Sequence, residues 1–283
     1  DGTGGTGNQV TTAAGVPTGT VMGYVTAGKW SLTTGKTVHA KWTANPYTIT
    51  YNAGDGSVTP DTTEVTYDSA DALHVPTRTG YSFGGWYDGT GGTGNQVTTA
   101  AGVPTGTVAN YVTAGKWSLT TSKTVYAKWT ANQYTITCNA NGGTVANPTT
   151  DVTYDSADAL LVPTRTGYTF NGWYDGNGGT GNQVTTATGV PTGTVTGYVA
   201  SGKWSLTTGK TVYAKWTINQ YTVTFNANGG TAVSPVTQDY NTQMAAAPAS
   251  AKEGHTLAGW YTDAGLTTAA SFPYTITENS TLY

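Results

Sequence analysis

A tryptophan recurs at a fixed spacing and sets the organisation of the whole chain. Trp86, Trp173 and Trp260 lie 87 residues apart, and each follows a glycine within a similar aromatic segment. Self-similarity at a fixed period marks an array of structural units, and a unit of this length can bury a small core of its own. The 283 residues are therefore expected to fold as consecutive compact modules.

The repeat register divides the chain into four segments. Residues 1–45 correspond to the C-terminal half of a repeat, and residues 46–132 and 133–219 to two full repeats. Residues 220–283 form a shorter repeat that lacks a long glycine- and threonine-rich insert and stops within its last strand. Both ends of the sequence fall inside repeats, so we expect the chain to be a piece of a longer array.

The composition favours β-structure. Charged residues make up only 10% of the chain, which contains 39 Gly, 19 Tyr and 9 Trp. Thr, Val, Tyr and Trp suit strands, while Gly and Asn supply turns. Alternation of apolar and polar residues predicts strands near 47–51, 63–67, 80–88 and 124–130 of the first full repeat. Residues 68–73 are its one helical candidate, so the expected fold is mostly β, and α+β at most.

The aromatic segment around Trp86 is expected to be a central strand with apolar residues on both faces. Strict alternation places Phe83 on one face and Trp86 on the other. A small module needs large aromatic side chains in its core. The expected core residues are Tyr81, Phe83, Trp86 and Trp129, with Tyr168, Phe170, Trp173, Trp216 and Trp260 in the later repeats.

The insert, from Gly89 to about Thr121, holds the best candidates for exposed aromatic residues. Trp117 follows a Gly-Lys pair in the insert, and Trp30 and Trp204 occupy the same repeat position. Exposed indole faces stack on sugar rings, so these three residues are candidate ligand contacts. Packing in the core is the alternative interpretation.

The loop at the start of the insert has the composition of a weak calcium candidate. Its oxygen-bearing side chains are Asp88 and Asn95, with Asp175 and Asn182 in the next repeat. Calcium takes about six to eight oxygen ligands, several of them carboxylates. Each loop offers one carboxylate, so a β-turn without metal is the preferred interpretation and no cofactor is expected.

No pattern in the chain indicates catalysis. His39, His74 and His255 fall at different repeat positions, and no Ser–His–Asp or Cys–His set recurs. We therefore expect no enzymatic activity. Cys138, the only cysteine, occupies a position filled by aromatic residues in other repeats and is expected to be a small buried apolar residue. The net charge of −3 offers no basic patch for nucleic acid, and no apolar run reaches membrane-spanning length.

Three motifs in fixed order resemble the Listeria–Bacteroides repeat, also known as the internalin B-repeat. They read Tyr-Thr-Ile-Thr-Tyr/Cys-Asn-Ala, then Val-Pro-Thr-Arg-Thr-Gly-Tyr-Ser/Thr-Phe-Xaa-Gly-Trp-Tyr, then Val-Tyr-Ala-Lys-Trp-Thr. They cover essentially the whole chain as tandem copies. The resemblance implies a small β-grasp-like module in secreted or wall-attached bacterial surface proteins. The insert is longer than the usual segment, so its fold stays open.

The resemblance also implies a function, that of a structural stalk that projects another domain from the bacterial envelope. Only four residues separate Trp129 from Tyr134, so neighbouring repeats are the expected partners in a semi-rigid, elongated array. One alternative is multivalent binding of a glycan or host-surface protein through the insert. Another is self-association into a surface fibre through exposed sheet edges.

Overall fold

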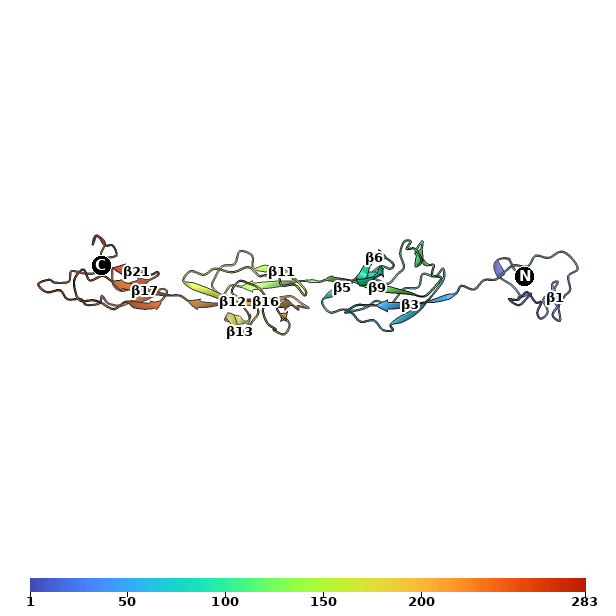
Figure 1. Cartoon of the computed structure of the whole chain (residues 1–283), viewed down its shortest axis with the longest axis horizontal. Coiled ribbons are helices and arrows are strands. Elements are labelled where there is room, and N and C mark those ends of the chain that lie inside the picture. The colour runs from blue at the N-terminus through green and yellow to red at the C-terminus, as the bar shows by residue number, and fades with distance from the viewer. The chain divides into compact units, whose positions relative to one another are not determined.

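The computed structural model describes residues 1–283 and consists almost entirely of strands and turns, gathered into small sheets (Figure 1). Its contacts divide the chain into two compact units. Unit 1 comprises Asp1–Arg78 with Phe83–Trp129, and unit 2 comprises Thr79–Ser82 with Thr130–Tyr283. The repeat boundaries read from the sequence stay predictions. No helix is long and apolar enough to cross a bilayer.

A five-stranded mixed sheet is the main element of unit 2. Its order is β11-β10-β16-β12-β13. The strands are β10 (Gln133–Asn139), β11 (Thr149–Thr153), β12 (Tyr168–Gly176), β13 (Thr180–Gln183) and β16 (Lys210–Ile218). β10 pairs antiparallel with β11 and parallel with β16, and β16 pairs antiparallel with β12. β16, the last strand of this sheet along the chain, therefore lies at its centre.

The same order, β4-β3-β9-β5-β6, recurs in the preceding sheet. Its strands are β3 (Pro46–Asn52), β4 (Thr62–Thr66), β5 (Tyr81–Gly89), β6 (Thr93–Gln96) and β9 (Lys123–Ala131). The strands predicted near residues 47–51 and 63–67 are confirmed as β3 and β4, which pair antiparallel. Asn52 Oδ1 accepts a hydrogen bond from the Gly54 amide at 3.1 Å, which stabilises the turn that leaves β3.

The last repeat is a reduced version of this sheet. β17 (Gln220–Phe225) lies between β18 (Val236–Asp239) and β21 (Ser280–Leu282), and β19 (Thr242–Met244) pairs with β20 (Tyr274–Ile276). The parallel pairing of β17 with β21 repeats that of β10 with β16. No strand takes the place that β12 holds beside β16.

The long insert is folded into the sheet's core. It forms short ribbons, β7 (Val112–Thr113) with β8 (Lys116–Trp117) and β14 (Val199–Ala200) with β15 (Lys203–Trp204), matched by β1 (Val25–Thr26) with β2 (Lys29–Trp30). Three-residue 3-10 turns, η1 (Thr3–Gly5), η2 (Thr90–Gly92) and η3 (Asn177–Gly179), begin the inserts. Val97, Val108, Val112, Trp117 and Leu119 join the buried cluster of unit 1. The mostly-β expectation is confirmed, while the β-grasp assignment stays a prediction.

The aromatic strands β5 and β12 differ from expectation in their position within the sheet and in the direction of their side chains. They lie inside the sheet, but the centre belongs to β9 and β16. Strict alternation is interrupted by a bulge between Phe170 and Gly172. As a result the Phe170 and Trp173 rings meet at 5.3 Å in one core instead of facing opposite sides. Phe83 and Trp86 meet at the same distance in unit 1.

The short helix predicted at residues 68–73 is wrong. This segment carries no helix, because its backbone groups bond to the insert. The Asp68 amide donates to the Trp117 carbonyl at 2.7 Å, and the Leu73 amide donates to the Gly102 carbonyl at 2.9 Å. Those partners satisfy groups that a helix would have paired internally.

Cys138 is buried, as predicted, in the core cluster of residues 133–219. Burial disfavours the thiolate and raises the pKa of the Cys138 thiol to about 11. The side chain therefore acts as a small apolar residue, in place of the aromatic ring that Tyr51 supplies in the first full repeat.

Replacing Gly85, the counterpart of Gly172, with alanine tests the backbone conformation at this position of β5. Gly85 has a φ of +116°, and a Cβ there would overlap the Thr98 carbonyl oxygen, so Gly85→Ala should lower unfolding stability by at least about 2 kcal/mol. Gly84→Ala is the matched control, because a Cβ at Gly84 meets its nearest atom at 3.5 Å. It should change stability by less than about 0.5 kcal/mol in denaturant unfolding. Equal effects of the two changes would show that the positive φ of Gly85 and its contact with Thr98 are not required.

Candidate functional site

The most constrained connection in unit 2 is the one-residue link between its two larger sheets. Only Asn219 separates β16 from β17. The Asn219 amide donates to the Gly167 carbonyl at 2.9 Å, and the Asn219 carbonyl accepts from the Tyr240 amide at 2.8 Å. Gly167 precedes β12, and Tyr240 lies in the turn between β18 and β19. Both backbone groups of the linking residue are therefore held, one by each repeat.

Side chains also pack around this link, and we call Asn219 with its contacts to Gly167 and Tyr240 the joint. The Tyr240 ring lies against Gly167, whose φ is +75°, so that a Cβ at this position would overlap the ring. Tyr221 approaches Tyr240 edge to face, with ring centroids 6.2 Å apart. The Thr169 hydroxyl donates to Asn219 Oδ1 at 2.6 Å. Glycine is thus required at position 167 by both its backbone angle and its neighbour.

The contacts recur at the corresponding residues within unit 2. The Asn132 amide donates to the Gly80 carbonyl at 2.9 Å, and the Tyr154 amide donates to the Asn132 carbonyl at 2.8 Å. Ser82 replaces Thr169 as the hydroxyl donor, at 2.6 Å from Asn132 Oδ1. The recurrence shows that the joint is a repeated feature of the sequence and not particular to one position.

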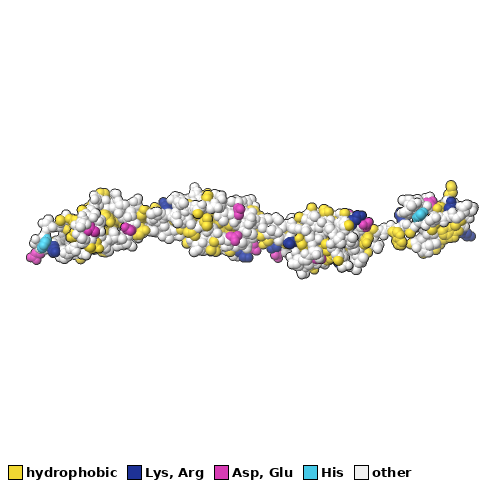
Figure 2. Space-filling view, turned by 90° about the horizontal axis from the view of Figure 1, so that it is seen from above, with side chains coloured by type: hydrophobic (Ala, Val, Ile, Leu, Met, Phe, Trp, Pro, Cys, Tyr) yellow, Lys and Arg dark blue, Asp and Glu magenta, His cyan; other side chains and the backbone are white.

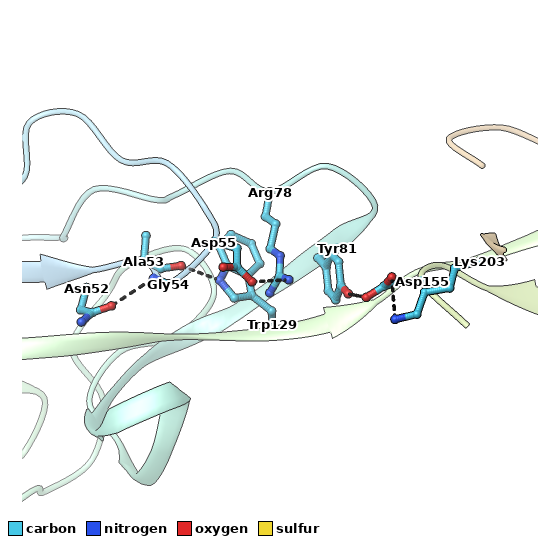
Figure 3. A network of polar contacts seen from close by, with 9 residues as sticks. All are labelled: Asn52, Ala53, Gly54, Asp55, Arg78, Tyr81, Trp129, Asp155 and Lys203. Carbon is cyan, nitrogen blue, oxygen red and sulfur yellow. Dashed lines mark hydrogen bonds and ion pairs between the residues drawn. The ribbon is translucent and has the colours of Figure 1, made fainter. Parts of the chain in front are cut away.

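Polar groups border this second set of contacts. The Tyr81 ring meets Tyr154 edge to face at 5.5 Å, and its hydroxyl points to Asp155 at 3.3 Å (Figure 3). Lys203 approaches the same carboxylate at 3.2 Å. Both members of the ion pair are half-exposed, so it adds little to stability. Within unit 1, Arg78 forms a separate ion pair with Asp55 at 2.9 Å (Figure 3).

The expected core residues fall into two groups. Trp86, Trp173, Trp260 and Phe170 are buried, and Phe83, Trp129 and Trp216 pack against the clusters. Tyr81 and Tyr168 do not belong to the core as expected, because both lie outside the clusters and are only half-buried. Tyr81 packs on Tyr154, and Tyr168 lies under the Arg165 guanidinium at 3.7 Å.

The exposure expected of Trp117 and Trp204 is wrong, since each is only 1% exposed. Trp117 Nε1 donates to the Asp71 carbonyl at 2.9 Å, and Trp204 Nε1 donates to the Asp158 carbonyl at 2.8 Å. Their indole faces are covered and cannot stack on a sugar ring. Trp30, at the same repeat position, is 49% exposed.

The loop that begins at Asp88 is closed by its own hydrogen bonds. Asp88 Oδ1 accepts from the Asn95 amide at 2.7 Å, and Asp88 Oδ2 accepts from Asn95 Nδ2 at 3.0 Å. Asp175 and Asn182 repeat the arrangement at 2.7 and 3.1 Å. No group of three or more His, Cys, Asp or Glu residues is placed to hold a metal ion. The same two hydrogen bonds thus close the loop in both repeats.

Two features were not anticipated from the sequence. One is the Asn219 joint, for which the recurrence of asparagine at positions 45, 132 and 219 was the available signal. The other is a cavity of about 210 Å³ in the last repeat, lined by Ala227, Gly230, Leu257 and Trp260 among others.

Comparison with known proteins identifies the repeats. Residues 47–128, 134–200 and 221–283 match the Listeria-Bacteroides repeat domain. The chain belongs to this family. The resemblance drawn from the three motifs is therefore confirmed over most of the chain.

Three relatives are similar in sequence to this chain. Two proteins of Evansella cellulosilytica, named "Putative membrane protein" and "Putative Gly-rich membrane protein", are 32% identical over 256 residues and 31% identical over 254 residues. Each alignment covers 87% of this chain, but only 32% and 25% of the respective relative. Internalin H of Listeria monocytogenes is 38% identical over 133 residues, which are 44% of this chain and 20% of Internalin H. The chain thus spans a third or less of each relative.

Replacing Trp204 with alanine tests its role in the core. Loss of a fully buried indole and its hydrogen bond should lower unfolding stability by about 3–5 kcal/mol. Trp30→Ala, at the same repeat position but half-exposed, should lower it by less than about 1 kcal/mol. Denaturant unfolding measures both. Unchanged stability of Trp204→Ala would restore the interpretation of Trp204 as an exposed ligand contact.

Replacing Gly167 with alanine tests the joint. The new methyl group should displace the Tyr240 ring and speed hydrogen exchange of the Asn219 and Tyr240 amides by roughly tenfold or more. Gly178→Ala is matched for backbone strain, with a φ of +73° and no atom within 4 Å of the added Cβ. It should leave exchange of both amides unchanged. Equal exchange rates in the two variants would show that the Tyr240 contact does not hold the joint.

Proposed function

We propose that these Listeria–Bacteroides repeats form a structural spacer in a bacterial cell-surface protein. The family match and the similarity to Internalin H support this assignment. The names of the two Evansella relatives agree with a location at the cell envelope. None of the three names describes an enzyme, and we propose no catalytic role.

The one-residue joint at Asn219 is the observation that carries the proposal. A spacer holds an attached domain at a set distance only if each repeat restrains the orientation of the next. A flexible linker lets neighbouring domains reorient, because nothing bonds its backbone. Here the single linking residue has its amide and its carbonyl hydrogen-bonded to flanking repeats, and an aromatic ring packs over the contact. Such a joint suits repeats that hold another domain at a set distance.

The surface suits the same role. Figure 2 shows few Lys, Arg, Asp or Glu side chains on the visible face. Charged residues are only 10% of the chain. With little charge to screen, the reach of the repeats should depend weakly on ionic strength.

Burial of Trp117 and Trp204 removes the main support for the rival function. Multivalent ligand binding through the insert required exposed indole faces, and these two are covered. The spacer role needs no exposed aromatic residue.

Small-angle X-ray scattering of the 283-residue chain in dilute solution tests the spacer proposal. Modules laid end to end should give a maximum dimension on the order of 100 Å. The radius of gyration should lie well above the roughly 19 Å expected of one compact domain of this length. Both values should be the same at low and high salt. A radius of gyration near the compact value would rule out a spacer.

A further inference from the structure

Three asparagine–glycine pairs lie within residues 133–219, and they differ in how tightly the fold holds them. They are Asn141-Gly142, Asn171-Gly172 and Asn177-Gly178. In such a pair, the backbone nitrogen of the glycine can attack the side-chain amide carbon of the asparagine, because glycine has no side chain to obstruct the approach. The attack needs an asparagine side chain and a following peptide group that are free to rearrange.

The fold holds Asn141 through both its side chain and its backbone. Asn141 Nδ2 donates to the Ala214 carbonyl at 2.6 Å, and the Asn141 carbonyl accepts from the Arg165 guanidinium at 3.1 Å. The Asn141 amide also donates to Asn139 Oδ1 at 3.0 Å. These bonds must open before the nitrogen of Gly142 can reach the side chain.

Asn171 is held within strand β12. Its Nδ2 donates to the Thr217 hydroxyl at 2.6 Å, and its carbonyl accepts from Gln183 Nε2 at 3.0 Å. The next residue, Gly172, is buried and lies against the Thr185 carbonyl. Attack at this position would require local opening of the sheet.

Asn177 has none of these restraints. Its side chain is exposed and makes no hydrogen bond, and its backbone carbonyl accepts from the hydroxyl of Thr180, three residues away, at 2.9 Å. Gly178 is also exposed, with a φ of +73° and no atom within 4 Å of a Cβ placed on it. Both residues lie in η3, a three-residue turn between β12 and β13. They can therefore rearrange without breaking contacts to the core.

We propose that Asn177 is a site of spontaneous deamidation in the folded protein. The Gly178 nitrogen loses its proton and bonds to Cγ of Asn177, and the side-chain nitrogen leaves as ammonia, which closes a succinimide ring. Water then opens the ring at either carbonyl, so that residue 177 becomes an aspartate or an isoaspartate. Water is the one added reactant, and no group is oxidised or reduced. This modification goes beyond the spacer role and does not depend on it.

Deamidation changes the charge of the loop that begins at Asp175. That loop has a single carboxylate in residues 175–182, and the reaction adds another two positions after Asp175. The net charge of −3 becomes more negative by one unit. The corresponding residue of the first full repeat is Thr90, which has no amide to lose. The two inserts, otherwise similar in sequence, therefore diverge in charge as the protein ages.

Peptide mass spectrometry after incubation of the folded 283-residue chain at mildly alkaline pH measures the deamidated fraction at each asparagine. Asn177 should react roughly tenfold or more faster than Asn141 and Asn171, because the hydrogen bonds of those two residues must open first. Similar rates at the three positions, or an Asn177 that stays intact, would overturn the proposal.

Incubation in denaturant is the matched control for the role of the fold. Each of the three asparagines is followed by glycine, so unfolding should bring Asn141 and Asn171 close to the rate of Asn177. A difference that persists in denaturant would come from the neighbouring sequence and would refute protection by the fold.

Two variants test the reactive turn itself. Gly178→Ala should slow deamidation of Asn177 by roughly tenfold or more, because the new methyl group obstructs the attack. Thr90→Asn creates an asparagine–glycine pair in η2, where Gly91 has a φ of +68° and likewise no atom within 4 Å of an added Cβ. The new asparagine should react at about the rate of Asn177. Circular dichroism confirms that both variants are folded. Unchanged reaction of Asn177 in Gly178→Ala, or an intact asparagine in Thr90→Asn, would contradict the assignment of this turn as the site.

Discussion

Each repeat depends on indole N–H groups that bind carbonyls in segments without regular structure. Trp86 bonds to His74 at 2.9 Å, Trp117 to Asp71 at 2.9 Å and Trp129 to Ala53 at 2.9 Å. A buried indole needs a partner for its N–H, and a buried irregular segment needs partners for its carbonyls. The same bond meets both needs. It fastens the segment between β4 and β5, the turn after β3 and the insert to one aromatic core.

The sequence predicts those parts of the fold whose pattern is local. Alternation located β3 and β9, because Ile49 and Val125 face a core while their neighbours do not. The same rule failed at β12, where a bulge beside Gly172 brings Phe170 and Trp173 into one core. Gly172 lies against the Thr185 carbonyl of the insert, so alternation within β12 carries no sign of the bulge.

Long-range partners also explain the other corrections. The helix expected at residues 68–73 is replaced by backbone bonds to Trp117 and Gly102 in the insert. Trp117 looked exposed because glycine and lysine precede it, yet its indole is bound to Asp71, 46 residues away. A local pattern cannot reveal such a bond. For the candidate site, the sequence showed that Asn219 recurs, but not that both of its backbone groups are held.

The packing of Trp216 and the joint at Asn219 are coupled through the chain. Trp216 lies in β16, and Asn219 directly follows the end of that strand three residues later, so an indole fixed at the Ala140 carbonyl helps to fix where the linking residue emerges. At the start of β12, the Gly167 carbonyl and the Thr169 hydroxyl then bond to Asn219 at 2.9 and 2.6 Å. The packing of the core and the geometry of the joint therefore depend on the same pair of strands.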